Sequence, residues 1–450
     1  MRAQEWYDRR DDRQKRYAGR VLPHDRPILI RLDPAYAARY DGQVAAIVAA
    51  NLISRMSPNV GFEIPDVHIV TPLPWAGKSL GAHLIENAKA VDPFGDFQLR
   101  SWQSDDLVIS LGRSATQVTI HGSGWGAYTG PARSPILDCV APNPIGPALA
   151  VIIGAGRLFG SKLSAFGCDY VCDSLLWRNE LPAPESPGLP DIDLGQIWTI
   201  GTGSVGTAAL YFLTLASRRF TAELFDMDVV KIENLDRSPI FVASDANPGQ
   251  KIRKVIATEK YLRQVGVLDV RSHPYPLDSA QRWKNRPQGV PDVVISAANE
   301  RNVRYVIEQS YPPVQIYGTT GANWNATLMR HLPDMDPCSN CIFPPDMSKS
   351  ATSCATGTVV DAESSGEVDA ALPFLSFTAG LMTAAEILKL GMRDYPFTAN
   401  RVFFSASPNA ELGFMPVGMA ARQGCICSNR SPSIHRAMVE RTRYAHLGLQ

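Results

Sequence analysis

The segment G-T-G-S-V-G at residues 201–206 is the feature that most limits how this chain can fold. It follows a short apolar run, Q-I-W-T-I, and precedes an apolar stretch with helical spacing that starts near Val205. Between a strand and a helix, the first glycine of such a loop permits a tight turn, the second lets a phosphate approach the backbone and the third lets the helix pack closely. The helix N-terminus then offers free N–H groups to an anion. The pattern predicts a nucleotide site at Gly201, Gly203 and Gly206.

Strands alternate with helices on both sides of a proline-rich segment, L-P-A-P-E-S-P-G-L-P at residues 181–190. After it, the strands A-E-L-F-D and P-D-V-V-I-S flank a helix expected from about Gly249 to Val265. This alternation predicts the α/β class, with a Rossmann-like, doubly wound and mostly parallel sheet. We expect an N-terminal α/β domain at 1–180, a linker at 181–194, the nucleotide-binding domain at 195–430 and a tail at 431–450.

Composition excludes several classes of protein. Lysine plus arginine and aspartate plus glutamate both number 44, so no charge excess points to nucleic acid or an anionic membrane surface as partner. The charged N-terminus has no apolar signal core, and no apolar run reaches the ~18 residues of a spanning helix. We therefore expect a cytoplasmic protein. Its 8 cysteines are too sparse for a disulfide scaffold, so clustered ones suggest metal binding or catalysis.

Two acids and several cations follow the glycine loop. Asp226 lies 20 residues after Gly206, at the end of a strand, where it can accept hydrogen bonds from ribose hydroxyls. Asp228 follows at once, then N-L-D-R at 234–237, and Lys251 and Lys254 lie farther along. A dehydrogenase needs no such cluster of cations, whereas an enzyme that handles a triphosphate does.

The run L-F-D-M-D-V-V-K-I-E-N-L-D-R resembles the D-x-D … N-L-x-R signature of ubiquitin-activating enzymes and their bacterial ThiF/MoeB-like relatives. The resemblance implies that Asp226 binds the ribose, that Asn234 belongs to the site, and that Arg237 and one lysine bind phosphates. K-V-I-A-T-E-K-Y-L-R resembles the family segment that favours Lys254 over Lys251.

Two further positions carry the resemblance. The family acid associated with magnesium and ATP is Asn299 here, so either Glu300 or Asp228 takes its place or the metal binds more weakly. R-D-D-R-Q at 10–14 resembles a family segment whose second arginine reaches an ATP site, which would be Arg13, acting in its own chain or in a partner chain. A solvated charged helix explains Arg13 equally well.

The cysteines form two pairs and a separate thiol. Cys338 with Cys341 and Cys425 with Cys427 offer the four thiolates of a closed, structural Zn²⁺ site. S-A-T-S-C-A-T-G-T, at 350–358, resembles the crossover loop on which several family members carry an acyl-accepting cysteine. Cys354 is thereby expected to be a nucleophile, while an inert buried thiol or a zinc ligand remain alternatives.

Together these features predict an enzyme that adenylates the C-terminal glycine of a ubiquitin-like protein with Mg²⁺–ATP and captures the acyl group on Cys354 for a conjugating-type enzyme. In bacteria such enzymes can serve conjugation systems, some of them antiviral. The first half is expected to be a degenerate adenylation half, which makes either a homodimer or an intramolecular pseudo-dimer. One alternative is a sulfur-carrier or peptide adenylyltransferase without a thioester. The 23 residues after Cys427 are too few for the ubiquitin-fold domain with which eukaryotic members recruit a conjugating enzyme. Another is an inactive nucleotide-binding scaffold, which Asn299 leaves open.

Overall fold

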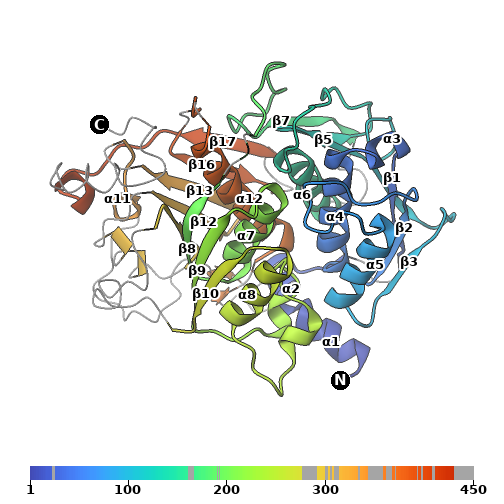
Figure 1. The fold of residues 1–450 in the computed structure, drawn as a ribbon. Coiled ribbons are helices and arrows are strands. Elements are labelled where there is room, and N and C mark those ends of the chain that lie inside the picture. Colours follow the sequence, from blue (N-terminus) through green and yellow to red (C-terminus); the bar gives the residue numbers. More distant parts are fainter. Residues whose placement is uncertain are drawn as a thin grey trace.

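The computed structural model describes two α/β halves that lie side by side (Figure 1). The residues described are 1–22, 26–160, 167–189, 191, 193–275, 291–298, 303–304, 307–308, 314–332, 335–342, 358–360, 367–369, 371–392, 394–396, 399–407 and 411–429. The expected tail at 431–450 lies outside them.

The first half is built on a seven-stranded sheet in the order β3-β2-β1-β4-β5-β6-β7. Neighbouring strands from β3 to β5 are parallel, and β6 and β7 are antiparallel to their neighbours. The strands are β1 (Ile28–Leu32), β2 (Asn59–Glu63), β3 (Asp96–Leu99), β4 (Leu107–Leu111), β5 (Thr119–Ser123), β6 (Gly126–Gly130) and β7 (Tyr170–Asp173).

Helices of the first half cover this sheet and begin at recognisable caps. The side chain of Asp33 accepts N–H bonds at the start of α3, and Ser79 does so at the start of α5. Every residue of α4 and of α6 is buried. Helix α6 is apolar except for Arg157, whereas α4 also buries Asp41, Gln43, Asn51 and Ser54. The helices are α1 (Ala3–Arg10), α2 (Asp12–Ala18), α3 (Pro34–Ala37), α4 (Tyr40–Ser54), α5 (Leu80–Val91) and α6 (Ile145–Gly160).

The second half has an eight-stranded sheet in the order β10-β9-β8-β11-β12-β13-β16-β17. The strands β10, β9, β8, β11 and β12 are parallel, and β13, β16 and β17 continue the sheet in antiparallel pairs. The strands are β8 (Gly195–Ile200), β9 (Phe220–Phe225), β10 (Asp269–His273), β11 (Val293–Ser296), β12 (Gln315–Gly321), β13 (Asn325–His331), β16 (Arg401–Ser405) and β17 (Gly413–Val417), with β14 (Thr358–Val360) and β15 (Glu367–Asp369) forming a separate hairpin.

The helices of the second half include one whose start differs from the prediction. Helix α8 begins at Lys254 rather than near Gly249, because an isolated bridge from Val229 to Arg253 and the positive φ of Lys251 (46°) hold the preceding residues in a loop. The described helices are α7 (Ser204–Ala216), α8 (Lys254–Gln264), α11 (Ser339–Ile342) and α12 (Pro373–Leu390), with short 3₁₀ helices η2 (Ile232–Asn234), η3 (Ala243–Ala246) and η4 (Ile426–Asn429).

The two halves repeat one topology. In each, the first strand leads to a buried helix (α4 or α7), the second strand leads through a helix (α5 or α8) to an edge strand, and two more parallel strands precede an antiparallel one. A long buried helix comes after that strand in each half: α6 directly in the first, and α12 after α11 and the β14–β15 hairpin in the second. Both sheets therefore share the strand order 3-2-1-4-5-6-7, to which the second adds an eighth strand, β17. This confirms the expected fold class of two mostly parallel α/β units.

Four helices join the halves in the middle of the molecule (Figure 1). Helix α12 packs on both α7 and α6, and α6 packs on α4, so a single hydrophobic core runs through both halves. A buried hydrogen bond crosses the same junction: Trp177 Nε1 donates to Glu386 Oε1 on α12 at 2.8 Å, and Lys389 of the same helix donates to that oxygen at 2.7 Å. The repeat is thus an intramolecular pair of α/β units.

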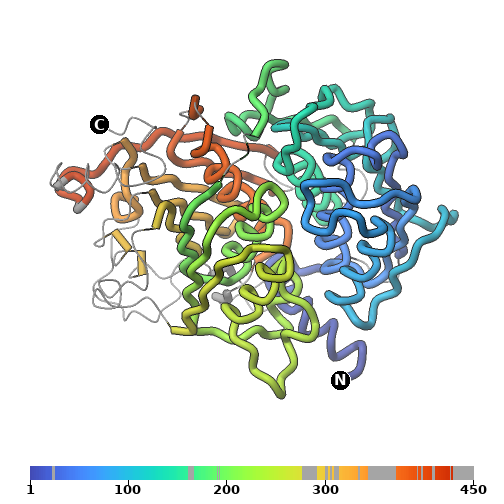
Figure 2. Tube along the Cα trace, viewed as in Figure 1, coloured from blue at the N-terminus to red at the C-terminus, as the bar shows by residue number. Residues whose placement is uncertain are grey.

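The N-terminal helices leave the first half and lie against the second. Figure 2 shows this blue segment beside the yellow-green chain that contains η2. Arg9 forms an ion pair with Glu233 at 3.1 Å, and Tyr17 donates to the carbonyl of Gly321 at 2.6 Å. Across the residues that are described, no helix has both the length and the apolar character needed to cross a membrane.

Candidate active site and metal centre

The glycine loop follows β8, and each of its three glycines has a distinct environment. Gly201 has a φ of +89°, which side-chain-bearing residues rarely adopt. A Cβ on Gly206 would lie 2.1 Å from the carbonyl oxygen of Gly201, so only glycine allows α7 to start this close to β8. A Cβ on Gly203 would meet no atom within 4 Å. The loop is therefore closely packed at its two ends and open at its middle, as a phosphate cradle requires.

Asp226 lies at the end of β9, directly beside this loop. One carboxylate oxygen accepts the N–H of Thr202 at 2.8 Å, and the other accepts the N–H of Asp228 at 2.9 Å. These two bonds fix the plane of the carboxylate at the loop. The first oxygen also accepts the hydroxyl of Thr202 at 3.3 Å, and the second keeps a lone pair for a further donor. The geometry suits the acceptor of ribose hydroxyls that the sequence predicted.

The structure separates the two candidate lysines. The ammonium of Lys254, at the start of α8, donates to Asp228 at 2.7 Å and is 13% exposed. Its backbone N–H also donates to the carbonyl of Asp228 at 2.9 Å, so the two residues are held together twice. Lys251 is exposed on the preceding loop. Lys254 thus contacts Asp228, whose N–H is bound by Asp226. Among the described residues, no hydrogen bond or ion pair joins Lys251 to these two acids.

Arg237 is buried against its own segment. Its guanidinium donates to the carbonyl of Glu233 at 2.5 Å and pairs with Asp236 at 2.7 Å. Asn234 caps η2 by accepting the N–H of Lys231 at 3.0 Å. Burial raises the pKa of Asp236 to about 6, while the Arg237 charge beside it acts in the opposite direction. N-L-D-R therefore forms a rigid buried turn that carries a cation.

Arg13 approaches this turn from the N-terminal helices of the same chain. Its charge favours the ionised form of Asp236, as do those of Arg237 and Arg10, and this places Arg13 in the electrostatic environment of N-L-D-R. Arg10 itself is wholly buried and pairs with Asp11 at 2.6 Å. Within this chain, Arg13 and Arg237 therefore both act on the carboxylate of Asp236.

Sequence reasoning missed two residues that hold this turn from the first half. Arg55, wholly buried at the end of α4, donates to the carbonyls of Leu235, Pro239 (2.9 Å) and Phe241 (3.1 Å). Asn51, one helical turn earlier, accepts from Arg55 at 2.8 Å and donates to the carbonyl of Pro239 at 3.1 Å. Two polar residues spaced i,i+4 directly after the wholly apolar run V-A-A-I-V-A-A at 44–50 are the signal that could have revealed them.

Three predicted positions lie outside the described residues, namely Asn299, Glu300 and Cys354. Their contributions stay predictions. Of the three cysteines in the first half, Cys172 is buried, Cys139 is half-buried and Cys168 is exposed. The thiol of Cys168 lies 3.7 Å from the guanidinium of Arg157.

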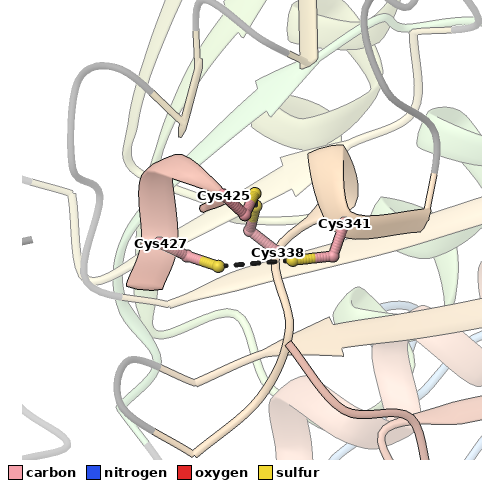
Figure 3. Close-up of side chains that lie close together, drawn as sticks. All are labelled: Cys338, Cys341, Cys425 and Cys427. Carbon is pink, nitrogen blue, oxygen red and sulfur yellow. Dashed lines mark hydrogen bonds between the residues drawn. The ribbon is translucent and has the colours of Figure 1, made fainter. Parts of the chain in front are cut away.

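The two cysteine pairs converge into a single cluster (Figure 3). All four Sγ atoms lie within 4.8 Å of one another, with closest separations of 3.5 Å for Cys338–Cys425 and 3.4 Å for Cys341–Cys427. Thiolates at ~2.3 Å from a tetrahedral Zn²⁺ are ~3.8 Å apart, so this set fits zinc. The backbone N–H of Arg422 donates to Cys341 Sγ at 3.2 Å, as expected of a donor that orients a metal ligand.

The comparisons with known proteins agree with this geometry. The ThiF family model matches residues 181–427, which is more than half of the chain. Among curated proteins, the uncharacterized protein y4jF of Sinorhizobium fredii is 25% identical over 331 residues; the aligned region is 71% of this chain and 60% of that protein's length.

Solved structures with detectable similarity include MccB of E. coli in complex with MccA. It is 17% identical, with a TM-score of 0.41, and the match covers 53% of this chain and 68% of that one. PaaA is 14% identical, with a TM-score of 0.36 and coverage of 49% and 62%. On the evidence of the family match over its glycine loop, its cation-bearing turn and its cysteine pairs, the chain belongs to the ThiF family.

Proposed function

We propose that this protein uses Mg²⁺–ATP to adenylate the C-terminal carboxylate of a ubiquitin-like protein ending in glycine. The observation that carries the proposal is the open space at Gly203, bordered by the oriented carboxylate of Asp226 and by the Lys254–Asp228 pair. An open backbone cradle, a ribose acceptor and a cation at one edge of a parallel sheet are the parts that nucleotide binding requires.

In this proposal the carboxylate oxygen of the partner attacks the α-phosphorus of ATP, and pyrophosphate leaves. The free N–H groups at the start of α7, together with Lys254, Arg237 and Arg13, stabilise the charge on the phosphates. Magnesium would add positive charge between the phosphates, with Asp228 and Asn299 as its protein ligands. The turn that carries Arg237 contributes mainly by holding its cation at a fixed position.

The second step we propose is transfer of the acyl group to Cys354. Its thiolate attacks the acyl carbon, the thioester forms and AMP leaves with the phosphate oxygen. Strand β14 begins at Thr358, four residues after Cys354, and lies against helix α2, which also carries Arg13. Since four residues of chain span at most ~14 Å, this connection supports a thiol that can reach the adenylate. A conjugating-type enzyme would then accept the acyl group.

The first experiment is ATP–pyrophosphate exchange with glycine-ended candidate partners, on the full chain. We expect exchange that depends on the partner and persists in Cys354→Ala, while a thiol-labile adduct on the enzyme disappears. Cys168→Ala is the matched control, because it removes an exposed thiol elsewhere and should leave both signals intact.

The outcomes distinguish a thioester-forming enzyme from an adenylyltransferase without a thioester and from an inactive scaffold. Exchange with an adduct that Cys354→Ala does not affect would remove the thioester step and favour the sulfur-carrier or peptide adenylyltransferase. Absence of exchange across all candidate partners, with ATP still bound, would leave only the nucleotide-binding scaffold.

A further inference from the structure

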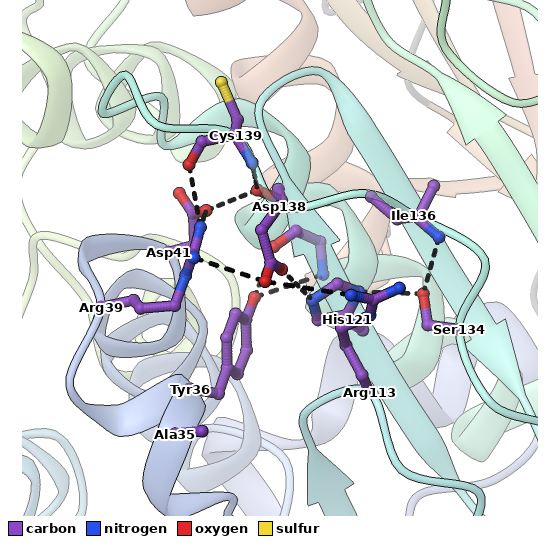
Figure 4. A network of polar contacts seen from close by, with 12 residues as sticks. Ala35, Tyr36, Arg39, Asp41, Arg113, His121, Ser134, Ile136, Asp138 and Cys139 are labelled. Carbon is purple, nitrogen blue, oxygen red and sulfur yellow. Dashed lines mark hydrogen bonds and ion pairs between the residues drawn. The ribbon is translucent and has the colours of Figure 1, made fainter. Parts of the chain in front are cut away.

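The first half has its own polar cluster at the carboxyl edge of its sheet (Figure 4). Strand order reverses between β1 and β4 there, and the crevice at such a switch point is where open α/β sheets bind ligands. The corresponding edge of the second sheet holds the glycine loop. After β1 the chain instead reads D-P-A-Y, and the side chain of Asp33 accepts the N–H of Ala35 at 2.9 Å. The first half therefore has no glycine cradle at this edge.

Three nitrogen-bearing side chains from three elements converge there on one carboxylate, that of Asp138 (Figure 4). Arg39 precedes α4, Arg113 follows β4 and His121 lies on β5. Their nearest nitrogens lie 3.4, 3.9 and 3.7 Å, respectively, from the oxygens of Asp138. Asp138 accepts no hydrogen bond from them, so it is an electrostatic partner at a distance rather than a fitted one.

Each of the three side chains also keeps a buried nitrogen without a hydrogen-bond partner. These are Nε of Arg39, Nε of Arg113 and Nε2 of His121, and the imidazole of His121 is wholly buried. A buried donor left without an acceptor costs ~1–3 kcal/mol. Nε2 of His121 faces Asp138 at 3.7 Å without a hydrogen bond, beside the Nη1 atoms of the two arginines, so a better acceptor belongs at this point.

The tautomer of His121 agrees with a donor at Nε2. Its Nδ1 lies 2.9 Å from Ser134 Oγ, and that oxygen already accepts the N–H of Ile136 at 3.2 Å. The serine proton can therefore go to Nδ1, which leaves the histidine proton on Nε2. Burial, with the charges of Arg113 and Arg39, lowers the pKa of His121 to about 3, so the ring is neutral at pH 7.

We propose that Arg39, Arg113 and His121 form a second anion site that takes a phosphoryl group, free or carried on a nucleotide, when the Asp138 side chain rotates away. Donors that arrive from three elements suit a tetrahedral group with at least three oxygens, whereas Asp138 offers two. The neighbouring Asp41 offsets one of the two arginine charges, so rotation of Asp138 leaves one net positive charge for the ligand.

The backbone need not move for this exchange. Asp138 is 39% exposed, so its side chain can turn toward solvent. The next residue, Cys139, is held by its N–H, which donates to Ser123 Oγ at 2.7 Å, and by its carbonyl, which accepts from Arg39 at 2.8 Å. Side-chain rotation at a surface position is fast, so Asp138 acts as a displaceable internal ligand.

The test is titration of the full chain, labelled with ¹⁵N-histidine, with phosphate, pyrophosphate, AMP and acetate at constant ionic strength. The His121 ring signals, assigned with His121→Gln, report this site alone and do not depend on the proposed adenylation. We expect a saturable shift with phosphate, and Asp138→Asn should bind it ~10-fold more tightly because an internal competitor is lost. If phosphate alone causes the shift, the ligand is a free oxyanion. If only AMP causes it, the ligand is a nucleotide, and either result supports the site.

Arg113→Gln in the Asp138→Asn background should abolish the shift. Arg133→Gln, which changes an exposed arginine on the loop that carries Asp138, should leave the shift unchanged. Urea unfolding of each variant checks that it is folded. Absence of a saturable shift in folded Asp138→Asn would overturn the site, and acetate binding as tightly as phosphate would overturn its assignment to phosphoryl groups.

Discussion

A methyl group added at Gly206 or at Gly203 separates the two tasks of the glycine loop, packing and ligand approach. At Gly206 the new Cβ would lie 2.1 Å from the carbonyl oxygen of Gly201. Carbon and oxygen atoms normally stay ~3.3 Å apart, so α7 and β8 would have to separate by ~1 Å. Overpacking of a core costs ~1–3 kcal/mol, and here backbone must move on both sides. We expect Gly206→Ala to lose about 3 kcal/mol of unfolding free energy.

At Gly203 the same change should leave stability alone and weaken ATP binding. The φ of −76° is open to any residue, and no atom lies within 4 Å of the new methyl group. The unfolding free energy should therefore change by no more than ~0.5 kcal/mol. The methyl group occupies the space through which a phosphate reaches the backbone. Loss of one charge-assisted hydrogen bond, ~1.5–3 kcal/mol, raises the Kd for ATP ~10–100-fold.

Urea unfolding and calorimetric titration with Mg²⁺–ATP measure both quantities on the same samples. Gly418→Ala is the control, since its Cβ also meets no atom within 4 Å and it lies far along the chain from the loop. If Gly206→Ala is as stable as the parent, the close packing of α7 on β8 is not what requires glycine. If Gly203→Ala binds ATP as the parent does, phosphate does not approach the protein at this point.

Three further outcomes are expected. Arg55→Met should give faster amide hydrogen exchange in residues 235–241 and lower the free energy of unfolding by about 3 kcal/mol, because buried carbonyls lose their donor. Arg157→Met removes a similar carbonyl donor elsewhere and should leave exchange in that segment unchanged. One Zn²⁺ per chain should be found by elemental analysis and lost in Cys338→Ser, with Tm lowered by about 5 °C or more, whereas Cys168→Ser should keep the metal; unchanged zinc content in Cys338→Ser would exclude this site. Burial raises the pKa of Asp236 to about 6. The stability that its protonated form contributes is therefore fully present below pH ~3.8 and is lost as the pH rises through 6. The unfolding free energies measured at pH 5 and pH 7 should accordingly differ less in Asp236→Asn than in the parent.

The parts of the site that come from short, continuous segments were open to prediction. The roles of Gly201, Gly203 and Gly206 follow from backbone geometry over six residues, so the pattern alone identified a closely packed turn with an open middle. The carboxylate of Asp226 ends the next strand, and parallel strands bring their carboxyl ends to one edge. Both features depend on local structure and on sheet direction, which composition and periodicity reveal.

The choice between the two lysines needed tertiary structure. Lys251 and Lys254 are three residues apart, and sequence resemblance only ranked them. The bridge between Val229 and Arg253 fixes the loop against the D-x-D segment, and this brings the ammonium of Lys254 onto Asp228. No periodicity in the sequence predicts such a contact, because its two residues lie on separate segments.

By itself, then, the sequence determined the α/β class, the nucleotide loop and the two cysteine pairs, because each is encoded in residues whose spacing has a direct physical meaning. Only the tertiary structure decided that the first sheet has the same order as seven strands of the second, since the repeat lies in topology and the first strand of the first half is not followed by a glycine loop. It also decided that Arg55 and Asn51 hold the N-L-D-R turn. These contacts depend on burial between residues almost 200 positions apart, where packing of the halves, and not local propensity, selects the partners.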